Sequence, residues 1–389
     1  MSALSYLEKL LNGVDVEWVA LGSIADIGTG SSNRQDESDN GTYPFFVRSK
    51  NILKSDTFEF DEVAIVIPGE GGVGDIFHYV EGKYALHQRA YRISIQSNSL
   101  ITKFVYHFML SSFKQYILMK RAGATAISIR KPMLEGFQVP IPCPDQPEKS
   151  LAIQSEIVRI LDKFTALTAE LTAELTMRKK QYNYYRDQLL SLEEDEIEWK
   201  ALDDVCAFIS AGGDVPENSV KGQVKPTNEY PYPIYANATD EKGLYGYTDS
   251  YKIDSDAVTI SARGAKVGYH TVRDAKFTPI IRLIVLVANK NLVRTRYLNY
   301  VLDMTAIGGT DGGIPQLTVP MVKKITVPIP FASNPNRSLA EQDRIIAILD
   351  KFEILTNSIS EGLPREINLR QKQYEYYRDL LLSFPKSNV

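Results

Sequence analysis

The sequence predicts an α+β protein: two mixed α/β domains separated by two long antiparallel coiled-coil helices, with a pseudo-two-fold internal repeat. Two observations predict this fold. The first is a repeat that extends along most of the 389 residues, and the second is a helical pattern confined to two of the repeated segments. Because the chain is duplicated, we expect each half to contribute one domain and one long helix.

The repeat is strongest in two pairs of segments. Residues 139–168 and 327–356 are identical at 17 of 30 positions without a gap. Residues 180–191 and 372–383 are identical at 10 of 12 positions, and the second copy is four residues longer between the two pairs. The chain therefore alternates between variable blocks and near-constant blocks.

Outside these segments the repeat is weaker but keeps the same order. The corresponding pairs are Glu17-Trp18 with Glu198-Trp199, Tyr43-Pro44 with Tyr232-Pro233, Ala64–Gly74 with Ala257–Gly268, and Pro132-Met133 with Pro320-Met321. Leu10-Leu11-Asn12-Gly13 is similar to the end of a near-constant block. We therefore expect the N-terminus and the C-terminus to meet.

The first near-constant block predicts a long helix. From Ile157 to Leu189 the positions at alternating spacings of four and three are apolar except for Thr168 and Arg178, and this spacing is the repeat of a left-handed coiled coil. Ser150 precedes this pattern as the expected N-cap. Thr168–Leu175 contains the unit TAEL twice. Adding or removing one such unit would change the length of the helix by about 6 Å.

The second near-constant block keeps the same apolar pattern until Gly362-Leu363-Pro364. Proline lacks a backbone donor and clashes with the preceding turn, so we expect a kink or a new start of the helix there. Since each helix has a single apolar stripe, we expect the two helices to pack against each other, antiparallel. The alternative is that each helix packs on a different protein.

The variable blocks predict mixed domains, because apolar runs typical of strands alternate with turn residues and helical segments. Strands are expected at Val63–Ile67, Tyr91–Ile95, Ala257–Ile260 and Ile280–Val287, and helices at Tyr106–Met119 and Arg296–Met304. Both blocks end on Val-Pro-Ile-Pro, whose prolines favour an extended exit into the long helix.

These patterns divide the chain into five parts. An N-terminal segment, residues 1–17, is expected to pack near the C-terminal helix. The first mixed domain spans residues 18–145 and the second spans residues 199–333. The central helix with its TAEL repeats spans residues 146–198, and the C-terminal helix spans residues 334–389.

The composition, 44% hydrophobic and 24% charged, is that of a soluble globular protein. The first residues lack the pattern of a signal peptide and no stretch reaches 18 apolar residues, so we expect a cytoplasmic protein without a membrane span. Cys143 and Cys206 are far apart and have no partner at a metal-binding spacing. We expect both thiols to be reduced and buried or idle.

The net charge of −4 argues against a nucleic-acid binder, but the charges are unevenly distributed. Residues 76–131 contain nine Lys or Arg and one acidic residue, Glu81, while residues 257–302 contain eight and one acidic residue, Asp274. These stretches would suit two faces that contact phosphates. The alternative is that they form ordinary surfaces whose acidic neighbours are close in space.

Motifs of a DNA-modifying enzyme are absent from the sequence. An adenine methyltransferase would need a glycine-rich turn after a strand and an Asn/Asp-Pro-Pro-aromatic loop, and an ATPase would need a P-loop. Glu81-Gly82-Lys83 and Asp274-Ala275-Lys276 would suit the Mg²⁺ site of a nuclease, or hairpin turns, which the glycine favours. The four histidines form no metal-binding spacing.

Residues that read DNA are instead present in the predicted loops. Arginine and lysine pair with guanine, and asparagine and glutamine pair with adenine, when loops on a rigid core present them. In the first domain the candidates are Asn33, Arg34, Arg48, Lys50, Gln88, Arg89, Arg121 and Arg130. In the second domain they are Lys221, Lys225, Asn237, Arg263, Lys266, Thr278, Arg282 and Gln316.

The order of variable domain, long helix, variable domain, long helix resembles the specificity subunits of type I restriction-modification enzymes. The motifs that carry the resemblance are the Val-Pro-Ile-Pro exits and the sequences ILDKF and QYxYYRDxLL, which occur in both helices. The TAEL repeat and Glu361–Glu366 look like the IC group of these subunits.

The resemblance implies a non-catalytic subunit in which each target-recognition domain reads one half of a split, asymmetric site in double-stranded DNA. The helices would set the length of the unread gap and recruit two methyltransferase (modification) subunits, which carry S-adenosylmethionine. Two restriction/translocase subunits would use ATP and Mg²⁺. This chain would bind no metal and no cofactor itself.

Two other classes of protein remain as alternatives at this point. A coiled-coil adaptor would bind proteins only and show no preference among DNA sequences. A self-sufficient DNA enzyme would methylate or cut DNA without partners, although the motifs for such chemistry are missing.

Overall fold

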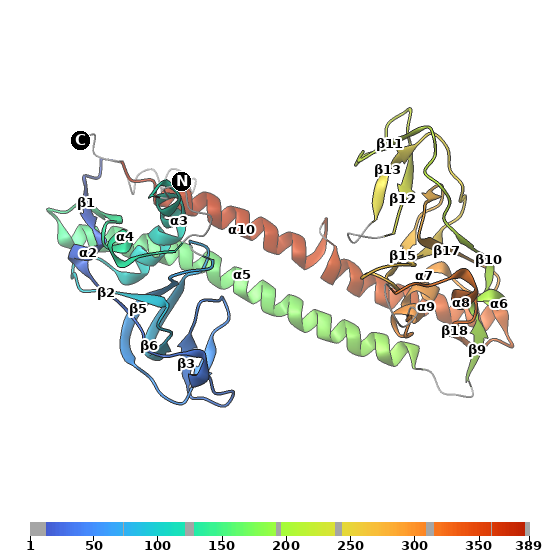
Figure 1. Ribbon diagram of the computed structural model, residues 1–389, viewed down its shortest axis with the longest axis horizontal. Helices are drawn as coiled ribbons and strands as arrows, with labels where there is room; N and C mark the ends of the chain where they lie inside the picture. The colour runs from blue at the N-terminus through green and yellow to red at the C-terminus, as the bar shows by residue number, and fades with distance from the viewer. Residues whose placement is uncertain are drawn as a thin grey trace. The chain divides into compact units, whose positions relative to one another are not determined.

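The computed structural model describes residues 13–72, 74–120, 128–191, 196–237, 243–308, 315–358 and 360–385 (Figure 1). The chain divides into two compact units. Unit 1 comprises residues 1–172 and 366–389, and unit 2 comprises residues 173–365. The boundary between the units cuts two long helices within their length, so the five-part division expected from the sequence stays a prediction.

Unit 1 is built on a six-stranded sheet with the strand order β2-β7-β5-β6-β3-β4. The strands are β2 (Ala25–Thr29), β3 (Tyr43–Phe46), β4 (Leu53–Ser55), β5 (Phe60–Pro68), β6 (His78–Leu86) and β7 (Ala90–Ile95). Helix α3 (Thr102–Lys120) covers one face and buries Phe104, Phe108 and Phe113 in the same core as Ile65 and Ile93. The strands expected at Val63–Ile67 and Tyr91–Ile95 are β5 and β7.

A small second sheet of unit 1 joins the two ends of its domain. Strand β1 (Val16–Ala20) pairs antiparallel with β8 (Gln138–Pro142), which contains the expected extended Val-Pro-Ile-Pro. The short elements of this unit are α2 (Leu21–Ile24), η1 (Arg34–Asp36) and α4 (Lys131–Glu135).

Unit 2 repeats this plan with its main strands in two four-stranded sheets, ordered β10-β17-β14-β15 and β11-β13-β12-β16. The strands are β10 (Cys206–Ala211), β11 (Ser219–Lys221), β12 (Tyr232–Tyr235), β13 (Leu244–Thr248), β14 (Ala257–Ser261), β15 (His270–Arg273), β16 (Thr278–Pro279) and β17 (Leu283–Ala288). The other elements are β9 (Ile197–Ala201), α6 (Leu202–Val205), α7 (Thr295–Asp303), α8 (Val319–Lys323) and β18 (Thr326–Pro330). Strand β9 pairs antiparallel with β18 as β1 pairs with β8.

One strand of unit 2 begins later than the sequence predicts. Residues Ile280–Arg282 are not part of β17, which begins at Leu283. Arg282 has a φ of 69°, in the left-handed region, so the chain turns there before it enters the sheet.

Two of the three long helices begin at a proline. Helix α5 spans Pro147–Leu190, and α9 spans Pro335–Asn357. The expected N-cap Ser150 is wrong, because it lies inside α5 and its backbone N–H donates to Gln146 O at 2.9 Å. A proline fits the first helical position because that position needs no backbone donor.

The interruption expected near Pro364 is present. Helix α9 ends at Asn357 and helix α10 begins at Gly362 and ends at Leu381. Gly362 has a φ of 74°, and a Cβ atom there would lie 2.4 Å from Ile354 O. Only glycine therefore fits this position without strain.

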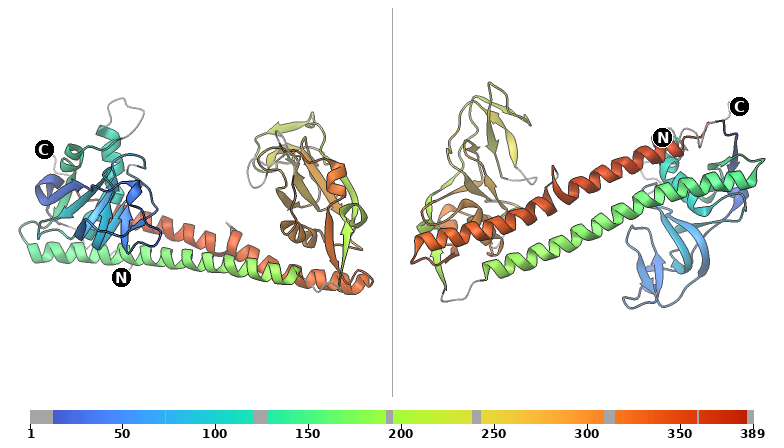
Figure 2. Two further views of the ribbon diagram at one scale, coloured as in Figure 1. Left: turned by 60° about the horizontal axis from the view of Figure 1, so that its bottom comes forward. Right: turned by 180° about the vertical axis from the view of Figure 1, so that it is seen from behind.

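The long helices pack against each other within each unit. In unit 1, Leu161 of α5 and Leu381 of α10 are fully buried in one core, and the two helices run side by side in opposite directions (Figures 1 and 2). In unit 2, Leu190 of α5 and Leu349 of α9 share the second core. The expected helix-against-helix packing is confirmed, whereas the coiled-coil geometry stays a prediction.

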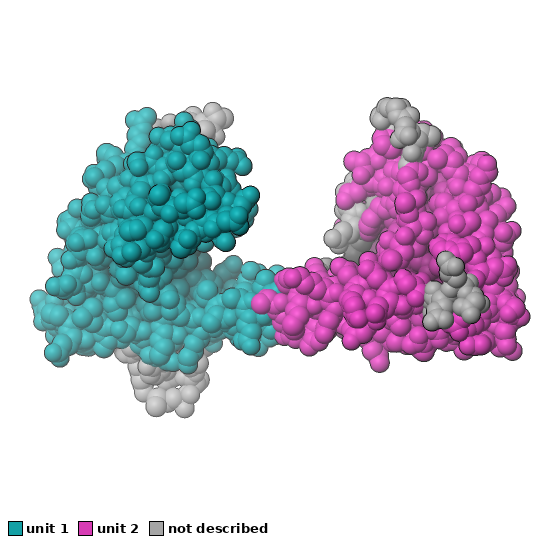
Figure 3. All heavy atoms as spheres, turned by 90° about the horizontal axis from the view of Figure 1, so that it is seen from below, with its two compact units in different colours: residues 1–172, 366–389 teal, residues 173–365 magenta. Residues whose placement is uncertain are grey.

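Figure 3 shows the two units in space-filling form. Each has its own hydrophobic core between its sheets and its helices. Among the described residues, no helix combines the length and the apolar character that a membrane span requires.

Candidate nucleic-acid interface

In unit 1, three loops meet beyond the ends of the central strands. The backbone N–H of Gly69, after β5, donates to the carbonyl oxygen of Arg89 at 2.9 Å. Ile129 N–H donates to Gly69 O at 2.7 Å, and Glu70 forms an antiparallel bridge with Ser128. Hydrogen bonds between backbones therefore hold the loop after β5, the β6–β7 turn and the segment before α4 together.

Charged side chains converge at this meeting point. Arg48 Nη1 lies 2.6 Å and Arg89 Nη1 lies 2.7 Å from the same carboxylate oxygen, Glu70 Oε1. We call the surface formed by Arg48, Glu70, Arg89 and Ser128 rim 1. A hollow of about 190 Å³ lies beside it, lined by Glu70, Arg89, Ser128 and five neighbours.

The protonation states of rim 1 follow from these contacts. Hydrogen bonding from Arg89, with help from Arg48, holds the pKa of Glu70 below its usual range. Burial, and then the positive charges of Arg48 and Arg89, lower the pKa of the neighbouring His87. Near neutral pH rim 1 therefore combines two arginines with a carboxylate, and the imidazole of His87 beside it is uncharged.

Two predicted amide readers lie next to each other in the same unit. Gln88 Nε2 donates to Asn33 Oδ1, so the loop after β2 is joined to the β6–β7 turn. Glu59 holds the start of that loop, since its carboxylate accepts hydrogen bonds from the backbone N–H groups of Ser31 at 2.8 Å and Ser32 at 3.1 Å.

In unit 2, a second group of predicted readers meets in the same way. Asn237 Nδ2 donates to Arg263 O at 2.8 Å, and Arg263 forms an antiparallel bridge with Gln316. Ala262 N–H donates to Arg282 O at 2.9 Å. We call the surface formed by Asn237, Arg263, Arg282 and Gln316 rim 2.

Each member of rim 2 occupies the place of one member of rim 1 in the repeated fold. The corresponding pairs are Arg48 with Asn237, Glu70 with Arg263, Arg89 with Arg282, and Ser128 with Gln316. The two units therefore present side chains from equivalent loops, with an arginine retained at one position and different residue types at the others.

The remaining candidates lie outside the two rims. Arg34 is exposed and lies 3.8 Å from Glu37, Lys221 lies over the ring of Tyr245, and Arg121 lies outside the described residues. The side chains of Lys50, Arg130, Lys225 and Lys266 are exposed. Thr278 is 1% exposed and its hydroxyl donates to Ser250 O, so it would need a rearrangement to contact DNA.

Acidic residues neutralise part of the charge of the two basic stretches. Many of their cations are paired with carboxylates from other parts of the chain, as the alternative interpretation holds. In unit 1 the pairs include Arg92 with Asp26, Lys103 with Asp162, and Lys114 with Asp75. In unit 2 they include Lys290 with Asp256, Arg294 with Asp343, and Arg296 with Asp350.

The hairpin expected at Glu81-Gly82-Lys83 is wrong, because Gly82 lies within β6 and pairs with Glu62 of β5. Glu81 accepts a hydrogen bond from the hydroxyl of Tyr79 at 2.8 Å. Asp274-Ala275-Lys276 lies in a bend between β15 and β16, and because these strands belong to different sheets it is not a hairpin turn either. Within the described ranges, no group of three His, Cys, Asp or Glu side chains is arranged to hold a metal ion.

Glu70 is the functional candidate that sequence reasoning missed. Its position in a glycine-rich loop after a buried strand is a signal for a backbone held close to other loops. That signal does not say which arginines approach the carboxylate, because Arg48 and Arg89 lie in other loops of the chain.

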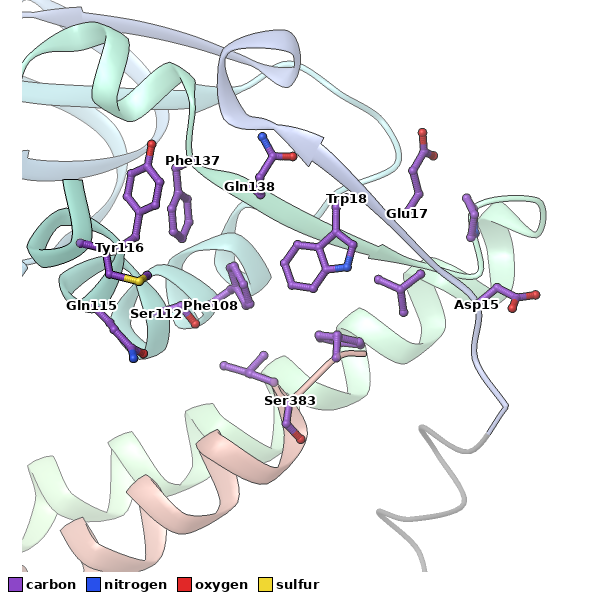
Figure 4. Close-up of a pocket in the computed structure, with 15 residues that line it drawn as sticks. Asp15, Glu17, Trp18, Phe108, Ser112, Gln115, Tyr116, Phe137, Gln138 and Ser383 are labelled. Carbon is purple, nitrogen blue, oxygen red and sulfur yellow. The ribbon is translucent and has the colours of Figure 1, made fainter. Parts of the chain in front are cut away.

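A larger apolar pocket of about 930 Å³ lies in unit 1, where β1, α3, β8 and the end of α10 meet (Figure 4). The indole N–H of Trp18 donates to Pro385 O at 3.1 Å, and its ring lies 5.9 Å from that of Phe108. Residues shortly before Trp18 and after Leu381 thus lie close together. Residues 1–12 lie outside the described part of the chain.

Comparison with known proteins identifies the family. The family described as "Type I restriction modification DNA specificity domain" matches the chain twice, at residues 13–177 and 194–369. The chain belongs to this family. It is similar over 99% of its length to the Type I restriction enzyme EcoR124I/EcoR124II specificity subunit of Escherichia coli, with 37% identity and 98% of that protein covered.

Further relatives agree with this assignment to the type I specificity subunits. The EcoprrI specificity subunit of Escherichia coli is 32% identical over 93% of both chains. The crystal structure of the type I restriction-modification S subunit from M. genitalium has the same fold, with a TM-score of 0.64, 16% identity and coverage of 97% of this chain and 98% of that one.

Proposed function

We propose that this specificity subunit recognises a bipartite, asymmetric DNA site, with rim 1 reading one half and rim 2 reading the other. The observation that carries the proposal is the presence of equivalent rims in both units. Arg89 and Arg282 occupy the same place in them, and arginine is the residue that most often contacts guanine bidentately.

The differences between the rims support an asymmetric site. Rim 1 combines Arg48, Glu70 and Arg89, whereas rim 2 combines Asn237, Arg263 and Arg282. Because each residue type prefers different base edges in the major groove, the two surfaces would select different sequences. The candidates next to the rims, such as Asn33 and Gln88, would extend the reading or contact phosphates.

The proposed role of the long helices is to set the unread gap between the half-sites. Helix α5 is continuous over 44 residues and contributes to the cores of both units, as its residues Leu161 and Leu190 illustrate. Its two TAEL copies, Thr168–Leu175, lie where one unit ends and the other begins. One copy contributes about 6 Å, which is on the order of one to two base pairs.

The helices would also bind two methyltransferase subunits and support two restriction/translocase subunits. Equivalent tyrosines of the two QYxYYRDxLL motifs, Tyr184 and Tyr376, are 57% and 54% exposed, which suits a partner's apolar surface. In this proposal the chain catalyses nothing and binds no cofactor. S-adenosylmethionine, ATP and Mg²⁺ would be held by the partner subunits.

An exchange of the first domain tests the proposal. Residues 18–138 are replaced by the corresponding residues of another specificity subunit, and methylated adenines are mapped in cells that express the chain with its modification subunit. One half-site should change while the other half-site and the gap stay as they were. An adaptor without DNA preference would leave the methylated sequence unchanged, and this result would contradict the proposal.

A further inference from the structure

One carboxylate lies between two predicted DNA-contacting arginines at the surface of unit 1. Both Arg48 and Arg89 donate to Oε1 of Glu70, and no described side chain donates a hydrogen bond to its second oxygen, Oε2. The exposed fractions of the three side chains are 46% for Arg48, 59% for Arg89 and 38% for Glu70. The group is therefore accessible to a duplex, although its negative charge opposes the approach of a phosphate.

The fold itself does not require an acid at this position. In unit 2 the equivalent residue is Arg263, which forms the same antiparallel bridge with Gln316 that Glu70 forms with Ser128. There, the backbone N–H of Arg263 donates to Asn237 Oδ1 at 3.4 Å, and Asn237 Nδ2 donates to the carbonyl oxygen of Arg263 at 2.8 Å. Neither hydrogen bond involves the side chain of Arg263. The loop thus forms with either charge at this position.

The physical effect of such a carboxylate on two arginines is twofold. A free arginine side chain loses rotamer entropy when it binds, and a carboxylate that already holds it reduces the entropy still to be lost on binding. The carboxylate also penalises contacts to phosphates, which supply the sequence-independent part of binding. Contacts to base edges depend on hydrogen-bond geometry, so they lose less from a nearby negative charge.

We propose that Glu70 determines the base discrimination of the first recognition domain by orienting Arg48 and Arg89 and by opposing their contact with phosphates. The proposal rests on the DNA-reading function proposed above and adds a residue that does not itself need to touch DNA. Glu70 is thus a positioning residue. The second domain, with Arg263 in the same place, would depend more on sequence-independent binding.

Removal of the charge should leave the fold intact, because exposed ion pairs contribute little to stability. The test therefore uses Glu70→Gln, which keeps the shape of the side chain and removes its charge. The matched control is Glu62→Gln, which disrupts the 3.2 Å pair between Glu62 and Arg92 near the opposite end of the same strand, β5. Melting temperatures check that both variants are folded.

The measurement is DNA binding by the specificity subunit in complex with its modification subunits, on cognate duplexes and on duplexes altered in the first or the second half-site. For Glu70→Gln, discrimination against altered first half-sites should fall about tenfold, and the slope of log affinity against log salt should steepen by about one. Discrimination at the second half-site should stay unchanged. Glu62→Gln should behave as the unaltered protein does.

The outcomes separate this proposal from the proposed function. If Arg89→Gln weakens first-half-site binding but Glu70→Gln changes neither the discrimination nor the salt slope, the role of Glu70 is refuted and the reading function stands. If Arg89→Gln and Arg48→Gln also leave binding unchanged, rim 1 does not read DNA and both proposals fall. Equal loss of discrimination at both half-sites would mark a general structural effect and would also overturn the role of Glu70.

Discussion

The ring of Phe164 in α5 stacks on the ring of Tyr377 in α10, with centroids 5.3 Å apart and planes inclined by 22°. In unit 2 the rings of Tyr185 in α5 and Phe352 in α9 stack in the same way, at 5.6 Å and 27°. Phe164 corresponds to Phe352 in the repeat, and Tyr185 corresponds to Tyr377. The same two motifs, ILDKF and QYxYYRDxLL, therefore meet in each unit with their roles exchanged between the helices.

This aromatic contact predicts the effect of truncation. Phe164→Ala should lower the free energy of unfolding of unit 1 by about 2 kcal/mol, because a half-buried ring and its stacking partner lose contact. Denaturant unfolding followed by far-ultraviolet circular dichroism would measure it. Leu369→Ala, at a side chain of α10 that is 46% exposed, is the control and should change stability by less than about 0.5 kcal/mol. Equal effects would contradict the anchoring role of Phe164.

A change in the number of TAEL units should change the gap between the half-sites. Deletion of Thr172–Leu175 shortens α5 by about 6 Å, so the gap should shrink while both half-sites keep their sequences. Mapping of methylated adenines in cells that express the variant with its partners would measure gap and half-sites together. Altered half-sites with an unchanged gap would show that α5 does not set the spacing.

The two equivalent arginines should affect different halves of the site. Arg89→Gln should weaken binding to duplexes by about 1–3 kcal/mol through the first half-site, and Arg282→Gln through the second, if each contacts a guanine. At residue 282, glutamine and arginine have the same backbone strain, since both are non-glycine residues at a φ of 69°. Competition binding with duplexes altered in one half-site measures the effect. The control variants are Lys114→Gln and Lys290→Gln, whose lysines are paired with carboxylates in the same units.

A buried histidine should make unit 1 sensitive to acid. His107 is 1% exposed, and its Nε2 lies 2.9 Å from Asp162 Oδ1. Burial lowers its pKa, although Asp162 acts in the opposite direction. Between its ordinary pKa of 6.5 and its lowered value, the unfolded chain binds more protons than the folded one. Stability contributed by this group is therefore present above pH 6.5 and is lost as the pH falls.

Replacement of His107 tests this dependence, with His270 as a control of opposite sign. Burial opposes the charged form of His270, but Asp303, 3.2 Å from its Nε2, and neighbouring backbone groups outweigh burial and raise its pKa. Its contribution is therefore present below pH 6.5 and is lost as the pH rises through its folded pKa. Melting temperatures are measured at pH 7.5 and pH 5.5. His107→Gln should reduce the loss of stability on acidification, and His270→Gln should increase it. The same change in both variants would contradict the assignment.

Gly362 should tolerate no side chain. An alanine Cβ would lie 2.4 Å from Ile354 O and 2.8 Å from Leu355 O, at a φ of 74°. Gly362→Ala should therefore destabilise the chain by about 2 kcal/mol or more. Gly308→Ala, where a Cβ would meet no atom within 4 Å, should cost much less in the same thermal unfolding assay. A mild effect at Gly362 would show that the start of α10 rearranges easily.

The sequence alone was sufficient for the features that depend on local pattern and on the repeat. The 4,3 spacing predicted the helix between Ile157 and Leu189, and the proline predicted the interruption before α10. The apolar runs predicted β5 and β7, because alternation and β-branched residues are properties of neighbouring residues. The motifs in the two helices were enough to indicate the family.

What only the tertiary structure decided is which distant side chains meet. Arg48, Glu70 and Arg89 lie on three separate loops, and the strand order β7-β5-β6-β3 brings those loops together. The same folding places carboxylates beside many of the cations in the two basic stretches and buries Thr278. Local periodicity cannot specify such contacts, because they depend on strand register and on how loops cross, which the chain acquires only when the sheets assemble.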